Sequence, residues 1–161
     1  MAKRITVTTY YKQVISSRIG LAAVSGLVAG ALIWLLNLLL QHFLFQPLFC
    51  QSPDTHAACI DSNVWSWWIA AVIICLASLM VLVRGLVYRP LLVIIATLIT
   101  VWGIWDWLGA YSWWQATLWE ALIFGLAYAL YTLLARINNF AFSLLAMIAA
   151  VVVVRLVSLL A

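Results

Sequence analysis

The sequence predicts an all-α fold, a polytopic transmembrane helical bundle with five spans and a cytoplasmic N-terminus. Hydrophobic residues make up 68% of the 161-residue chain and charged residues only 7%, against about 25% charged residues in ordinary soluble domains. So few charges cannot cover a solvated surface, and such high hydrophobicity excludes a disordered chain. The alternation of apolar and polar residues that is typical of membrane β-barrels is absent. The spans are therefore expected to be helices.

Five apolar runs are expected to form the spans of one integral membrane domain, residues 1–161. A helix needs about 20 apolar residues to cross a bilayer. Proline is favoured in a first helical turn, so Pro90 is predicted to begin the third span, whereas Pro47 is predicted to end or redirect the first helix. The expected spans are about 19–44, 64–83, 90–108, 113–135 and 140–161, with an outer loop at 50–63.

The basic residues predict the orientation of the chain, because cytoplasmic loops of membrane proteins carry an excess of Lys and Arg. Seven of the eight basic residues fall on the N-terminal side of this topology: Lys3, Arg4, Lys12, Arg18, Arg84, Arg89 and Arg136. We therefore expect a cytoplasmic N-terminus and, after five spans, a C-terminus outside. In general type the chain resembles the small inner-membrane proteins of Gram-negative bacteria, a likeness that implies a bacterial inner (plasma) membrane protein. An outer interfacial belt is expected from the tryptophans on the other side, namely Trp65, Trp67, Trp68, Trp105, Trp107, Trp113 and Trp114.

Two of the three cysteines, Cys50 and Cys59, lie in the predicted outer loop. This loop faces an oxidising compartment under the expected topology, so we predict a disulfide between them. Two alternatives stay open, a redox-active pair and a metal site that includes His56. The spacing differs from the C-x-x-C of redox pairs, and a fourth metal ligand is missing. Cys75 lies mid-span and is expected to be a small packing residue.

Small residues form a stripe on the first span and another on the fourth. Ala22, Gly26 and Gly30 recur every four residues on the first span, and Ala121, Gly125 and Ala129 do so on the fourth. Small residues at this spacing let two helix backbones approach closely. The sequence leaves open whether the stripes serve homodimerisation or packing between helices of one chain.

Glu120 and Arg155 are the charged residues that lie clearly inside predicted spans. A charge inside the bilayer is costly, so each needs a partner or water. Both lie roughly 9–11 Å from the outer ends of neighbouring spans, which predicts an intramembrane ion pair. The pair would orient the two helices or serve a proton or substrate pathway. Alternatively, Arg155 reaches out to the interface or pairs with Asp106, and Glu120 faces interfacial water. A possible polar patch lies beside them on the first span: Asn37, Gln41 and His42.

The motifs of several enzyme classes are absent: no phosphate-binding loop, zinc-binding helix or nucleophile elbow occurs. We therefore expect neither enzyme activity nor a cofactor or metal. The basic residues are not interleaved with aromatic residues on one face, so no nucleic-acid partner is expected.

The sequence predicts a small multi-pass protein that acts through protein–protein contacts as an accessory or assembly partner. It would reside in the lipid bilayer with a membrane-protein partner or as a homo-oligomer. The alternative is an oligomeric transporter or channel unit with a polar site around Glu120 and Arg155.

Overall fold

A computed structural model describes residues 2–49 and 56–160 of the chain. All regular secondary structure in these ranges is helical, which confirms the predicted helical class. The long helices are α1 (Ala2–Leu40), α3 (His56–Arg84), α6 (Trp113–Ala135) and α7 (Phe140–Leu160). The shorter elements are the π-helical turn η1 (Gln41–Phe45), α2 (Gln46–Phe49), α4 (Pro90–Val101) and α5 (Ile104–Leu108).

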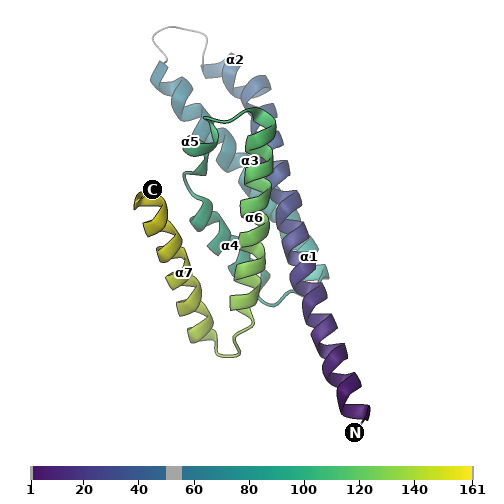
Figure 1. Ribbon diagram of the computed structural model, residues 1–161. Coiled ribbons are helices and arrows are strands. Elements are labelled where there is room, and N and C mark those ends of the chain that lie inside the picture. The colour runs from purple at the N-terminus through teal and green to yellow at the C-terminus, as the bar shows by residue number, and fades with distance from the viewer. Residues whose placement is uncertain (1, 50–55, 161) are drawn as a thin grey trace.

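The helices run alternately up and down the bundle, as Figure 1 shows. α6 packs along α1, α3 lies against α1, α4 packs on α6, and α7 is peripheral, in contact with α4 and α6. The connectors 85–89 and 136–139 lie at the end of the bundle nearer the N-terminus, and α5 lies at the other end. The Arg89 guanidinium lies 4.8 Å from the centre of the Phe140 ring, so the ends of the two connectors meet.

Three helical segments are long and apolar enough to cross a membrane: Arg18–Leu48, Val64–Arg84 and Trp113–Ala135. Two apolar segments are shorter, Pro90–Val101 and Phe140–Leu156. Large apolar side chains cover the outside of the bundle; Val24 is 58% exposed and Met80 is 69% exposed. An apolar exterior of this extent suits a hydrocarbon solvent and not water.

The first helix and the predicted outer loop differ from the expected boundaries. α1 begins at Ala2, well before position 19, because the polar residues ahead of the apolar run continue the same helix. Helical structure also continues through Pro47 to Phe49. Proline displaces the carbonyl one turn before it, and the π-helical turn η1 lies directly ahead of this position. α3 begins at His56, so the described part of the predicted loop 50–63 is helical.

The predicted third span, 90–108, is broken near its middle. α4 begins at Pro90 as expected but ends at Val101, and α5 begins at Ile104. Between them Gly103 has a φ of 84°, a left-handed conformation that glycine adopts without steric cost. The 12 residues of α4 rise about 18 Å, less than the roughly 30 Å of a bilayer core. This region therefore does not form a continuous spanning helix.

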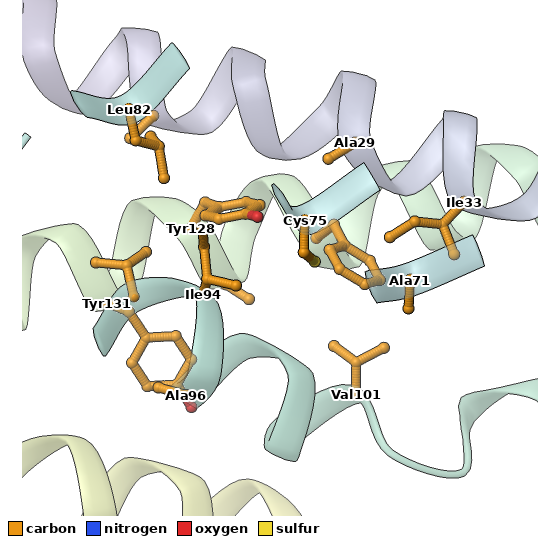
Figure 2. Packing of buried hydrophobic residues seen from close by; sticks show 14 of the residues in the cluster. Ala29, Ile33, Ala71, Cys75, Leu82, Ile94, Ala96, Val101, Tyr128 and Tyr131 are labelled. Atoms are coloured by element: carbon orange, nitrogen blue, oxygen red, sulfur yellow. The ribbon is translucent and has the colours of Figure 1, made fainter. Parts of the chain in front are cut away.

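The centre of the bundle is built around α6, as Figure 2 shows for Tyr128 and Tyr131. Both side chains are fully buried. The Tyr128 hydroxyl is hydrogen-bonded to the Ser78 hydroxyl of α3 at 2.9 Å, and the Tyr131 hydroxyl is hydrogen-bonded to Thr100 of α4. Each tyrosine thus fills the core with its ring and finds a partner for its hydroxyl on a neighbouring helix.

Candidate functional site

α1 and α6 approach closely at the glycines of α1. A Cβ atom on Gly30 would lie 2.6 Å from the backbone oxygen of Glu120 and 2.8 Å from the Cα of Ala121. A Cβ atom on Gly26 would lie 2.3 Å from the Tyr128 ring. These separations are far below ordinary contact distances, so only glycine fits at either position.

Gly125, in the stripe on α6, lies in the same contact between α1 and α6. Ala22 is fully buried. From the side of α6, a Cβ atom on Gly125 would lie 2.6 Å from Leu27 Cγ and 3.3 Å from the backbone oxygen of Ala23. Of the two roles that the sequence leaves open for these stripes, the structure shows packing between helices of one chain.

Glu120 lies on the inner face of α6 and is fully buried. Its Oε1 accepts a hydrogen bond of 2.9 Å from the Trp67 indole N–H of α3. Its Oε2 is buried without a hydrogen-bond partner among the described residues. Burial of a carboxyl group is costly unless hydrogen bonds replace those to water, and the indole N–H supplies one. This contact ties α6 to α3.

A second buried polar contact ties α3 to α1. The Ser66 hydroxyl donates to Asn37 Oδ1, and these side chains are 0% and 2% exposed. Consecutive residues of α3, Ser66 and Trp67, therefore bond to different helices. The rest of the predicted polar patch lies elsewhere: Gln41 is half-buried and His42 is exposed. Asn37 joins the interior of the bundle, whereas His42 does not.

Three tryptophans, Trp67, Trp68 and Trp102, form what we call the tryptophan cluster. The Trp67 and Trp68 rings lie edge to face with centroids 5.4 Å apart, and those of Trp68 and Trp102 do so at 4.7 Å. Aromatic pairs prefer this geometry because the positive edge of one ring meets the negative face of the other. The cluster joins α3 to the residue that follows α4.

Arg155 reaches the tryptophan cluster from α7. Its guanidinium Nη1 donates to the backbone oxygen of Trp102 at the end of α4. The last carbonyls of a helix lack donors within the helix and carry partial negative charge, so a cation there is stabilising. Glu120 and Arg155 thus bond to opposite ends of the cluster, at Trp67 and at Trp102. Glu120 and Arg155 are therefore each hydrogen-bonded to a tryptophan. The ion pair between the two side chains stays a prediction.

The predicted belt of outer tryptophans stays a prediction, and one of its members is buried. Trp65, Trp107, Trp113 and Trp114 are 64%, 47%, 64% and 51% exposed. Trp67 is instead fully buried, because its N–H finds an acceptor in Glu120. An indole with a buried acceptor no longer needs the interface.

Some expected sites lie outside what the structure describes. Cys50 is not among the described residues, and neither are the side chains of Cys59, His56 and Asp106. The disulfide therefore stays a prediction, as do its redox and metal alternatives and the pairing of Asp106 with Arg155. Cys75 is buried in α3 at 5% exposure, as expected of a packing residue.

Two of the grooves that are lined by described residues open on the sides of the bundle. One, of about 580 Å³, lies between α1 and α3, and the other, of about 270 Å³, lies between α4 and α7. Neither is lined by Glu120, Asn37 or Arg155. Comparison of the chain with protein-family models, with curated proteins and with solved structures finds no match.

Proposed function

We propose that this chain is a small multi-pass protein of a bacterial inner membrane that acts through protein–protein contacts, as an accessory or assembly partner. The enclosure of its polar side chains supports this role. Glu120 and Trp67 are 0% exposed and Asn37 is 2% exposed. A proton or ion pathway needs polar groups that water reaches. Here Glu120 is instead hydrogen-bonded to Trp67, and Asn37 to Ser66, between helices. They hold the bundle together and leave its outer faces for partners.

The face formed by α4 and α7 is the proposed contact surface. Its groove of about 270 Å³ is lined only by apolar side chains, Ile95 and Ile148 among them. α4 is too short to span a bilayer, so the groove lies beside an incomplete helix. A spanning helix of another membrane protein, or of a second copy, packs into such a groove through van der Waals contact.

The proposed orientation has a cytoplasmic N-terminus and five passes, of which the third is made by α4 and α5 with the break at Gly103 between them. The positions of four arginines support the cytoplasmic N-terminus. The Arg18 guanidinium donates to the Leu86 backbone oxygen at 3.4 Å, which places it beside the connector that carries Arg89 and follows Arg84, the last residue of α3. Arg136 lies in the other connector at this end. Basic residues gathered at one end favour the cytoplasmic side. A C-terminal alkaline phosphatase fusion is expected to be active, and an inactive fusion would contradict a C-terminus outside.

Photocrosslinking in native membranes tests the proposed contact surface. A photoreactive amino acid is placed at Ile95 or Ile148, which are 44% and 52% exposed. The control position is Leu126 on α6, which is 63% exposed. We expect a discrete adduct with one identified protein, or with a second copy, from the first two positions and not from the control. Equal adducts from all three positions would contradict this surface.

Reconstitution tests the alternative, an oligomeric transporter or channel. Purified chain in liposomes is expected to give the same proton and ion flux as liposomes without protein. Glu120→Ala is expected to leave that flux unchanged. Flux above the protein-free level that Glu120→Ala abolishes would contradict the accessory role and would support transport.

A further inference from the structure

We infer that the groove between α1 and α3 binds an acyl chain of an anionic phospholipid whose phosphate headgroup lies against Arg18 and Arg84. The groove has a volume of about 580 Å³, within the range of small-molecule sites. This inference is independent of the proposed contact surface, which lies on α4 and α7.

The wall of the groove suits hydrocarbon. Two hydroxyls occur in it, and both are bonded within their own helices: Ser25 donates to the Ala22 oxygen and Ser78 to the Cys75 oxygen. The wall therefore presents no hydroxyl that still needs a partner. The large side chains in it are apolar: Leu21, Val24, Val28, Leu32, Ile74 and Val81.

Small residues open the groove toward its basic end. Gly20 lines it, and a Cβ atom on Gly20 would have nothing within 4 Å. Ala77 lines the groove from α3 and is exposed. The groove is therefore open beside the backbones of α1 and α3. Its open part lies next to Arg18, the first residue of the apolar segment Arg18–Leu48.

Two arginines stand at this end of the groove. Arg18 lies three positions before Leu21, and Arg84 lies three positions after Val81, so each shares a helix face with a lining residue. Both arginines are exposed. The bond from Arg18 to the Leu86 oxygen holds its guanidinium beside the end of α3. Guanidinium groups bind phosphate through paired, charge-assisted hydrogen bonds.

The charge around this end of the groove is complementary to an anion. The four acidic residues of the sequence are at positions 54, 61, 106 and 120, and none of them lines the groove. Under the proposed orientation this end of the groove lies at the cytoplasmic leaflet. Anionic lipids of that leaflet attract basic segments, and basic pockets between spanning helices bind their headgroups. A lipid phosphate is therefore the anion that suits the site.

The length of the groove suits an acyl chain. From Gly20 to Leu32 α1 rises about 18 Å. One leaflet contributes about half of the roughly 30 Å hydrocarbon core, so an acyl chain of one leaflet matches the groove.

Lipid photolabelling tests the inference on the full chain in nanodiscs. The probe is phosphatidylglycerol with a diazirine in one acyl chain, and the comparison probe is phosphatidylcholine with the same chain. We expect the anionic probe to label Val28 and Ile74 several-fold more than the zwitterionic probe does. On Leu126, an exposed residue of α6, we expect equal labelling by both probes.

Matched variants separate the roles of the headgroup and the chain. Arg84→Gln is expected to reduce groove labelling by the anionic probe roughly fivefold, whereas Arg136→Gln, an exposed arginine at the end of α6, leaves it unchanged. Ala77→Phe is expected to remove labelling by both probes, and Ala149→Phe on α7 is expected to leave it unchanged. An unchanged circular dichroism spectrum and an unchanged unfolding midpoint report that each variant is folded.

Several results would overturn the inference. Equal labelling of Val28 and Ile74 by the two probes would show that the charge of the headgroup does not contribute to binding. Equal losses in Arg84→Gln and Arg136→Gln would reduce the effect to general attraction between charges. Disulfide crosslinks between two copies carrying Val28→Cys would show that a second copy occupies the groove.

Discussion

The substitution Gly30→Ala tests the close approach of α1 and α6. A Cβ atom at this position would lie 2.6 Å from the Glu120 backbone oxygen and 2.8 Å from the Ala121 Cα. Both are backbone atoms of a helix, so no side-chain rotation relieves the overlap and the two helices must move apart. Overpacking of this kind typically costs about 1–3 kcal/mol.

Gly20→Ala is the matched control, because a Cβ atom at Gly20 meets nothing within 4 Å. Replacing glycine by alanine inside a helix stabilises it by roughly 0.5–1 kcal/mol. Gly20→Ala is therefore expected to raise the free energy of unfolding by about that amount. Gly30→Ala gains the same propensity but suffers the overlap, so it is expected to lower the free energy of unfolding by about 1–2 kcal/mol.

The free energy of unfolding is measured for the purified chain in mixed micelles, by titration with a denaturing detergent and circular dichroism. The two variants are expected to shift the midpoint in opposite directions. If Gly30→Ala shifted the midpoint in the same direction as Gly20→Ala, α1 and α6 would not approach closely at Gly30. The packing derived for the small-residue stripes would then be refuted.

Three further predictions concern the polar contacts. Trp67→Phe is expected to lower the free energy of unfolding by about 1–3 kcal/mol, because Glu120 loses its buried donor. The control Trp65→Phe, at a 64% exposed position, is expected to change the free energy of unfolding little. Similar losses in the two variants would contradict the hydrogen bond between Trp67 and Glu120. Arg155→Ala is expected to speed amide hydrogen exchange at the end of α4, because the Trp102 oxygen loses a donor; unchanged exchange would show that Arg155 does not cap α4. In a double-mutant cycle of Glu120→Gln and Arg155→Ala, we expect the two losses of unfolding free energy to add, because the two side chains bond to different tryptophans. A coupling energy above about 0.5 kcal/mol would instead support the ion pair.

Much of the helical pattern was predictable because apolar runs mark the segments that suit a bilayer. The run 113–135 coincides with α6 (Trp113–Ala135), and Pro90 begins α4. The beginnings of α1 and α3 were not predictable from hydropathy, since a helix continues into polar sequence without change of backbone geometry. The break at Gly103 was also missed, because glycine occurs often within membrane helices and only its left-handed conformation marks the break.

The burial of Glu120 was predictable from its place in an apolar run, but its partner was not. The equal distances of Glu120 and Arg155 from the outer ends of their spans give the height of each residue along its helix. They do not show which face of the helix carries the side chain. Opposite charge alone also does not identify a neutral donor such as an indole N–H as the partner of a carboxyl group. Trp67 was assigned to the interface, where tryptophans are common, although a buried indole N–H requires an acceptor. That requirement is the signal that links it to Glu120.

The polar contacts of α3 explain how the bundle selects its helix faces. In lipid, apolar side chains gain little by meeting another helix in place of an acyl chain, so close packing and polar contacts decide which faces meet. Ser66 and Trp67 point in directions about 100° apart on the helix, toward Asn37 of α1 and Glu120 of α6. Two such contacts fix both the height and the rotation of α3. Because α3 is rigid, the same rotation determines that Ile74 lines the groove against α1.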